Sequence, residues 1–347
     1  MVRYAIVNVS QLLEPRKLFM KSNQTKQPVD FTGIAPALTT VKAALAAQQL
    51  AVPQYAADYN AALRTTGKMW RAALTILFAQ LAAPETDTLP PTVTTGATAI
   101  EMLHLATLMH DDVLDEAPIR RHRPTLQMKH GNHAAIYLGD ELLARYFRLV
   151  TEIAPDLAFT HYHARVMQQI LTGELQQAAE AYDTQAGIDT YVATVRGKTG
   201  ALFGLAAKTG VWLTQGAPDT ADTSTAFGEN LGITFQILDD LNDFRLQQNS
   251  GKPKLGDLES GIYTLPLRLG MRDYPQLQAL LVGPAPVSDI IAFLRRHPDI
   301  ITATARLGQV YLTKAQAALA QWPDTPARIP LTQMTAYLEQ ALQLTDV

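Results

Sequence analysis

The chain has 347 residues, of which 47% are hydrophobic and 18% are charged, and its formal net charge is −3. This composition supports a large buried core in one or two domains, and the lack of a basic excess gives no sign of a nucleic-acid-binding protein. Because the chain has no cysteine, it has no disulfides or thiolate metal sites, which fits a reducing, cytoplasmic location.

The first segment, residues 1–38, is interpreted as an N-terminal extension. It lacks the basic start and long apolar stretch of a signal peptide, and regular helical patterning begins only near Thr39. Met20 is therefore an alternative start position. No apolar run reaches the 18 or so residues that a membrane span requires, so no transmembrane segment is expected.

From Thr39 onward, apolar residues recur every three or four positions, as in residues 74–81. Stretches rich in Pro, Gly, Thr and Asp separate these segments, for example residues 84–91 and 216–225. No linker is long enough to divide the chain into two domains. The sequence therefore predicts an all-α fold, in which residues 39–347 form one bundle of roughly ten or more helices around a central cavity.

Two acidic clusters repeat one D-D-x-x-D spacing: Asp111, Asp112 and Asp115 form the first, and Asp239, Asp240 and Asp243 form the second. On an α-helix the first and last carboxylate of each cluster point the same way. Two such faces across a cavity would repel each other unless cations lay between them. One such motif alone is more often a solvated helix end, but two motifs that both follow apolar helices favour an oxygen-only Mg²⁺ site.

Basic and polar residues suited to phosphate accompany these clusters: Lys68, Arg71, Arg120, Arg121, Lys198, Thr199 and Lys252. Arginine offers a planar donor fork to phosphate oxygens, while lysine contributes a point charge. His104 shares a helical stripe with Asp111. Each basic pair alone could be an ordinary surface feature, and His104 alone a core histidine. Their joint occurrence favours a diphosphate substrate.

The Gly67-Lys68-Met69-Trp70-Arg71 segment, His104 and the two acidic clusters together resemble the trans-isoprenyl diphosphate synthases of the polyprenyl synthetase family, over roughly residues 39–342. The resemblance implies the isoprenoid synthase fold. It also implies head-to-tail (1′-4) condensation of isopentenyl diphosphate with an allylic diphosphate such as farnesyl diphosphate. In this family the six aspartates carry three Mg²⁺ ions that bridge to the allylic diphosphate.

The resemblance also assigns individual roles. Gly67, Lys68, Arg71, His104 and Arg121 match the residues that bind isopentenyl diphosphate, and Arg120 matches a contact to the allylic diphosphate. The positions around the allylic diphosphate and the developing cation are matched by Lys198, Thr199, Gln236 and Lys252. With the six aspartates, Lys198, Thr199 and Gln236 are the predicted catalytic residues.

Three positions differ from the family pattern or from its short-chain members. His122 replaces a usual glycine after the paired arginines, so that turn is expected to differ. Ile262 replaces a lysine, as in the catalytic component of two-subunit medium- and long-chain synthases. Ala106, beside Thr107, replaces a bulky aromatic residue of short-chain enzymes. An open helical turn advances about 5.4 Å, close to one isoprene unit, which favours a C30–C40 product for quinone side chains.

Other interpretations remain open. A short-chain C15 or C20 synthase would use the same motifs, a terpene cyclase would also use D-D-x-x-D, and a non-catalytic subunit would share the fold. The resemblance implies a homodimer or a heteromer with a small accessory subunit. It is also compatible with peripheral membrane contact during product release.

Overall fold

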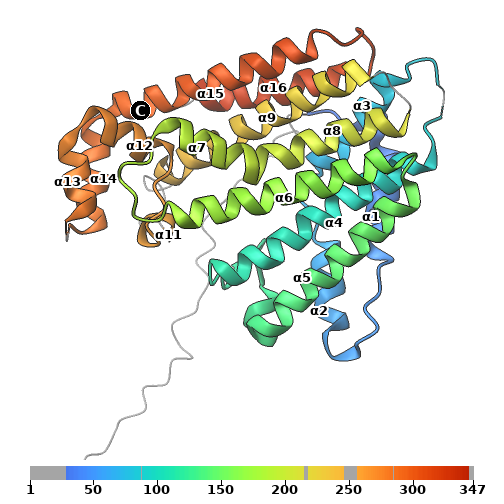
Figure 1. Ribbon diagram of the computed structural model, residues 1–347, viewed down its shortest axis with the longest axis horizontal. Helices are drawn as coiled ribbons and strands as arrows, with labels where there is room; N and C mark the ends of the chain where they lie inside the picture. Colours follow the sequence, from blue (N-terminus) through green and yellow to red (C-terminus); the bar gives the residue numbers. More distant parts are fainter. Residues whose placement is uncertain (1–28, 87, 215–217, 246–255, 284, 344–347) are drawn as a thin grey trace, which may run out of the picture.

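The structure, a computed structural model, describes residues 29–86, 88–214, 218–245, 256–283 and 285–343. The described chain is almost entirely helical, and its longer helices run side by side along the long axis of the molecule (Figure 1). These are α4 (Pro91–Leu114), α5 (Leu126–Ile153), α6 (Leu157–Ala179), α8 (Ala201–Leu213), α9 (Pro218–Arg245), α15 (Pro298–Leu319) and α16 (Arg328–Gln343). The predicted all-α fold is confirmed.

Shorter elements surround these helices. Near the N-terminal side lie η2 (Thr32–Ile34), α1 (Ala35–Ala46), α2 (Pro53–Arg64) and α3 (Trp70–Ala82). The remaining short helices are α7 (Ile188–Val195), α11 (Gly256–Glu259), α12 (Leu265–Asp273), α13 (Pro275–Val282) and α14 (Val287–Arg296), of which α13 and α14 stand at one end of the bundle (Figure 1). No described helix is long and apolar enough to cross a membrane.

The central pair of helices is α3 and α8, in which nearly every side chain is buried. A helix that is apolar on all sides belongs in the interior of a bundle. The hydroxyl of Thr75, fully buried in α3, donates to the Ala206 carbonyl of α8 (2.9 Å), which satisfies a polar group that would be costly to bury alone. This central pair supports α4 and α9, the two helices that carry the acidic clusters.

Helix α1 spans residue 38, where the sequence predicted the extension to end. Its residues Val41 and Leu45 are fully buried in the core. Residues 1–28, with Met20, lie outside the described residues, so the division at residue 38 stays a prediction.

Candidate active site

The first acidic cluster lies at the C-terminal end of α4. Asp111 belongs to the last helical turn, and Asp115 is the exposed C-cap residue. Asp112 is 7% exposed, and its carboxylate forms an ion pair with the Arg120 guanidinium. The side chains of Asp111 and Asp115, by contrast, have no hydrogen bond or ion pair within the described residues. The first and last carboxylates therefore remain available for a cation.

A two-stranded hairpin carries the predicted arginine pair. Strands β1 (Ile119–Arg120) and β2 (Arg123–Pro124) pair antiparallel. The two residues between them, Arg121 and His122, have φ of 50° and 64°, the left-handed region that a type I′ turn requires and that glycine or asparagine adopts most readily. The tight turn thus forms with histidine in the usual glycine position, at a cost in backbone strain.

Arg71, in the first turn of α3, lies in a buried polar cluster with two residues of α4. Its Nη1 lies 3.2 Å from Nε2 of His104, and its guanidinium lies 4.3 Å over the Phe203 ring. Glu101, 5% exposed, supplies the opposing charge and accepts a hydrogen bond from the Ala72 N–H (3.0 Å). Burial lowers the pKa of Arg71 to about 10 and, helped by the nearby arginines, lowers the pKa of His104 well below its usual range. At neutral pH a charged guanidinium therefore lies beside a neutral imidazole.

Two further predicted phosphate ligands come from the hairpin and from the loop that precedes α3. Arg121 donates to the Thr65 carbonyl and packs on Gly67, where a Cβ atom would lie 2.7 Å from Nη2 of Arg121. Any larger residue at position 67 would therefore displace this guanidinium. Lys68 instead reaches α16, where its Nζ lies 3.1 Å from the Tyr337 hydroxyl and 4.7 Å from the centre of that ring.

Lys198 lies in a π-helical turn, η3 (Arg196–Gly200), between α7 and α8. Its ammonium forms an ion pair with Glu174 of α6 (2.9 Å). Burial lowers the pKa of Lys198, but the carboxylates of Glu174, Asp111 and Asp115 outweigh burial and raise this pKa above its usual value. Single π-helical turns occur frequently at functional sites. Lys198 is therefore a fixed positive charge beside the first acidic cluster.

The second acidic cluster lies in the last turns of α9, where its middle carboxylate is held inside the protein. Asp240 is 4% exposed and accepts hydrogen bonds from the Tyr191 hydroxyl (2.6 Å), the Gln236 amide (3.0 Å) and the Leu265 N–H (3.1 Å). The Gln236 carbonyl in turn accepts from the Thr199 hydroxyl (3.0 Å). Two predicted catalytic residues thus form one hydrogen-bond chain with Asp240.

The other two aspartates of the second cluster share a different side of α9, since i and i+4 lie one turn apart. Asp239 is exposed, and it has no hydrogen bond or ion pair with the part of the chain that the structure describes. Asp243 is half-buried. As in the first cluster, the first carboxylate is available while its neighbour is bonded internally.

A cavity of about 90 Å³ joins the two clusters. Its wall includes Asp115 from the first cluster, Asp240 from the second, and Lys198, Gln236 and Asp257. Among the described residues, no three carboxylate or histidine side chains stand close enough to hold a metal ion by themselves. A cation here would need further oxygen ligands, as Mg²⁺ finds in phosphates and water.

Comparison with known proteins explains why these features occur together. Residues 52–284 match the family described as polyprenyl synthetase. The chain belongs to this family. It is 35% identical over 280 residues to nonaprenyl diphosphate synthase of Mycobacterium tuberculosis, which covers 78% of this chain and 82% of that protein. It is 34% identical over 249 residues to component 2 of heptaprenyl diphosphate synthase of Geobacillus stearothermophilus, and the match covers 70% of this chain and 77% of that protein.

Solved structures extend this similarity to the fold. A decaprenyl diphosphate synthase from Rhodobacter capsulatus has a TM-score of 0.80 at 26% identity, with 91% of this chain and 98% of that chain covered. A geranylgeranyl pyrophosphate synthase from Lactobacillus brevis has a TM-score of 0.79 at 32% identity, with 91% and 97% covered. The predicted family, the isoprenoid synthase fold and the prenyltransferase class are thereby confirmed.

The sequence analysis missed several residues around this candidate site, among them Glu101, Asp257 and Tyr337. A single acid between Ile100 and Met102 in an apolar helix was a usable signal, because such a group is buried only beside a partner. Asp257 and Tyr337 gave no signal, since their relevance depends on which helices meet in space.

The roles assigned to the predicted site residues stay predictions. Lys252 lies outside the described residues. Ala106 is fully buried within α4, and the Thr107 hydroxyl, half-buried, donates to the His104 carbonyl (2.9 Å). The roles of Ala106 and Thr107 in chain length stay predictions.

Proposed function

We propose that this polyprenyl synthetase condenses isopentenyl diphosphate head-to-tail (1′-4) with an allylic diphosphate such as farnesyl diphosphate. The product would be a medium- or long-chain all-trans polyprenyl diphosphate for quinone side chains. One observation carries the proposal: α4 contributes to two groups of opposite charge, an acidic one that suits a diphosphate bound through metal ions and a basic one that suits a diphosphate directly. Its end carries the carboxylates of Asp111 and Asp115, and seven residues earlier, about 10.5 Å along the helix, His104 lies beside Arg71.

The donor set at the acidic clusters fits Mg²⁺. All its side chains offer oxygen, which Mg²⁺ prefers, and Asp112 and Asp240 are already bonded within the protein. We infer that Asp111, Asp115, Asp239 and Asp243 hold three Mg²⁺ ions together with the allylic diphosphate, and that the middle aspartates support them. When bound, Mg²⁺ supplies positive charge that stabilises the leaving diphosphate.

The cluster around Arg71 suits the diphosphate of isopentenyl diphosphate. The Nε of Arg71 is buried and has no hydrogen-bond partner in the described part of the chain, so the hydrogen-bonding capacity of this guanidinium is not fully used within the protein. The neutral imidazole of His104 can donate from its N–H group. Lys68 and Arg121 add positive charge from the adjoining loop and hairpin. This second anion site is what a two-substrate condensation requires.

The chemistry then needs positioning more than acid–base groups. The allylic C1–O bond breaks and its electron pair leaves with the diphosphate. The double bond of isopentenyl diphosphate then forms the new carbon–carbon bond at C1. A proton is lost from C2 to the departing diphosphate, which regenerates an allylic product. Lys198 and Arg120 stabilise the negative charge that develops on the leaving oxygens.

Water must be excluded from a site that generates a carbocation, because water would capture it. Phe235 packs against Trp70 and Phe203, with ring centres 6.0 Å apart in each case, and these rings lie next to Arg71. The Thr199–Gln236 pair offers a hydroxyl oxygen and an amide dipole on the other side. We infer that this apolar wall shields the reacting carbons.

Product length is inferred from Ala106 and from the names of relatives. Several similar proteins are named for products with seven to ten prenyl units, whereas the L. brevis structure is named as a geranylgeranyl synthase. We favour the longer product, and a short C15 or C20 product is the alternative. Ala106→Phe should shorten the product, while an unchanged product spectrum would count against Ala106 as a chain-length residue.

We also infer a homodimer, or a heteromer with a small accessory subunit, in the cytoplasm. The relative named as component 2 and the isoleucine at position 262 both favour an accessory partner. Helices α5 and α6 carry exposed apolar side chains such as Tyr137 (70% exposed) and Leu175 (72% exposed), which a subunit interface would cover. Peripheral contact with a membrane would help to release an apolar product.

Mass analysis of the product from labelled isopentenyl diphosphate, farnesyl diphosphate and Mg²⁺ tests the function. A polyprenyl diphosphate longer than C15 supports it. A cyclic hydrocarbon would instead indicate a terpene cyclase. No turnover, alone or with an accessory subunit, would indicate a non-catalytic subunit.

A further inference from the structure

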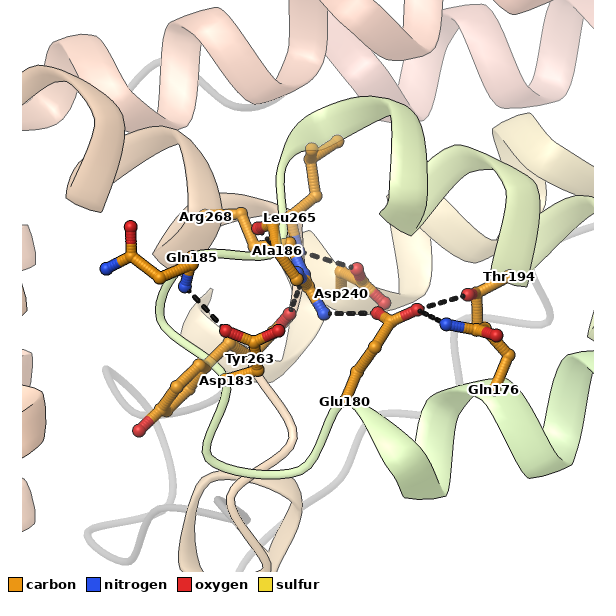
Figure 2. A network of polar contacts seen from close by, with 10 residues as sticks. All are labelled: Gln176, Glu180, Asp183, Gln185, Ala186, Thr194, Asp240, Tyr263, Leu265 and Arg268. Carbon is orange, nitrogen blue, oxygen red and sulfur yellow. Dashed lines mark hydrogen bonds and ion pairs between the residues drawn. The ribbon is translucent and has the colours of Figure 1, made fainter.

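A buried ion pair lies beside the second acidic cluster (Figure 2). Glu180, the C-cap residue of α6, and Arg268 of α12 are 5% and 6% exposed, and the Arg268 Nη2 lies 2.7 Å from the Glu180 Oε2. Neither residue is needed as a ligand in the proposed reaction. Because burying two charges costs desolvation energy, an apolar pair of similar size would often be at least as stable. Stability is thus a weak explanation for this pair.

Arg268 uses its three nitrogens on three different segments. Besides Glu180, its Nε donates to the Tyr263 carbonyl (2.8 Å) and its Nη1 donates to the Ala186 carbonyl (2.7 Å). The guanidinium therefore ties together the end of α6, the loop before α7 and the turn before α12. A lysine could not replace it, because one ammonium cannot reproduce the geometry of a planar fork.

Helix α7 connects this pair to the acidic cluster. The Thr194 hydroxyl donates to Glu180 (3.1 Å), and the Tyr191 hydroxyl donates to Asp240 (2.6 Å). Thr194 and Tyr191 are three residues apart and so lie on the same face of the helix. One face of α7 thus bonds both the buried pair and the middle carboxylate of the second cluster.

The turn before α12 makes a second connection. Arg268 holds the Tyr263 carbonyl, and two residues later the Leu265 N–H donates to the Asp240 carboxylate (3.1 Å). Figure 2 shows Arg268 between this turn and Glu180, with Asp240 on the adjoining side. Two of the three donors to Asp240 are therefore fixed by elements that the buried pair holds.

We propose that Glu180 and Arg268 are positioning residues for the second acidic cluster. By fixing Tyr191 and Leu265 against Asp240, they set the orientation of the last turns of α9, and hence the direction in which Asp239 meets Mg²⁺ and diphosphate. This inference rests on the proposed function of the acidic clusters. Both side chains also line the cavity that joins the two clusters.

The decisive variant replaces the pair by apolar residues, Glu180→Leu with Arg268→Met. The readout is the Mg²⁺ concentration that gives half of the maximal rise in melting temperature in the presence of inorganic diphosphate. We expect this concentration to increase at least fivefold, while the melting temperature without ligands stays within a few degrees of wild type. An unchanged Mg²⁺ midpoint would overturn the proposal.

A matched control exists on α5. Arg145 there pairs with Glu141 (2.6 Å) and also donates to the Gln48 side chain (2.9 Å) and the Gln49 carbonyl (2.8 Å). This second arginine therefore also ties several segments together, but it bonds neither acidic cluster. Glu141→Leu with Arg145→Met should leave the Mg²⁺ midpoint unchanged. An equal shift in this control would mean that the effect is general destabilisation, and would contradict positioning.

Arg268→Lys keeps the positive charge but removes the planar guanidinium that bonds three segments. This variant tests the proposal if the protein with both apolar substitutions does not fold. We expect at least a threefold higher Mg²⁺ midpoint, and no shift would again overturn the proposal. The two proposals fail separately. A wild-type protein that binds Mg²⁺ and diphosphate without prenyl transfer contradicts the function alone, whereas active wild type with unshifted variants contradicts positioning alone.

Discussion

Asp112 and Asp240 occupy the same place in two identical spacings, yet the protein holds them by opposite means. Asp112 is bonded to a charged guanidinium on a surface hairpin. Asp240 is bonded to a phenol, an amide and a backbone N–H in the interior. In both clusters the preceding aspartate has no hydrogen bond or ion pair with the residues that the structure describes. The difference teaches that one sequence spacing can be supported by an ion pair in one acidic cluster and by a network of neutral donors in the other.

The largest effect should come from the available carboxylates. Asp111→Asn and Asp239→Asn should each lower kcat by about 10³-fold or more, since losing about 4 kcal/mol of charge stabilisation corresponds to that factor. Incorporation of labelled isopentenyl diphosphate at saturating Mg²⁺ measures this loss. Near-wild-type turnover in either variant would remove that aspartate from the site.

The second effect concerns pH and separates Asp111 from Asp240. Partial burial raises the pKa of Asp111 from 3.8 to about 6. The nearby carboxylates of Glu174 and Asp115 also raise this pKa, whereas the ammonium of Lys198 lowers it. The pKa of Asp111 is higher in the folded than in the unfolded protein, so protonation of Asp111 stabilises the fold. This stabilisation is complete below about pH 4 and is lost as the pH rises through about 6. In metal-free protein at pH 8, Asp111→Asn should therefore raise the free energy of unfolding by up to about 3 kcal/mol.

Urea denaturation in a chelator at pH 5 and pH 8 measures this gain, which should shrink at the lower pH. Burial also raises the pKa of Asp240 to about 6. Three donors face that carboxylate, so the NH₂ group of an asparagine would meet a donor and Asp240→Asn should not stabilise the protein. Equal gains in the two variants would contradict this difference between the clusters.

The third effect tests the two kinds of support directly. Arg120→Met removes the ion-pair partner of Asp112, and Tyr191→Phe removes one donor to Asp240; each should cost about 1–3 kcal/mol of unfolding free energy. Because Arg120 is partly exposed, its contribution should shrink in 0.5 M salt, whereas that of buried Tyr191 should not. Chemical denaturation of both variants at two salt concentrations provides the measurement. Identical salt responses would show that the supports do not differ.

The smallest effect concerns the arginine hairpin. His122→Gly should raise the unfolding free energy by about 0.5–1 kcal/mol, because glycine adopts the positive φ of this position without strain. Thermal denaturation measures the gain. Exposed Arg123, which belongs to strand β2, offers a control, since Arg123→Gly should bring no gain. A loss of stability in His122→Gly would mean that the histidine side chain contributes more than its backbone costs.

The sequence was sufficient for the helical fold and for naming candidate anion-binding residues that the fold brings together, since helical spacing and charge type are local properties. Arg71 and His104, 33 positions apart, do meet. The internal bonding of Asp112 and Asp240 was not predictable, because their partners depend on how a hairpin and α7 fold back. Lys68 illustrates the same limit: its contact with Tyr337, 269 positions away, reflects the packing of α16 on α3.

The π-helical turn at Arg196–Gly200 also sets how α7 is rotated about the helix axis relative to α8. It accommodates one more residue than an α-helical turn would, and each residue rotates an α-helix by about 100°. Loss of a single residue there would therefore turn α7 relative to α8 by that angle. Tyr191 would then point away from Asp240, although no residue in contact with that carboxylate had changed. In this region the length of the chain is as strict a requirement as the identity of its side chains.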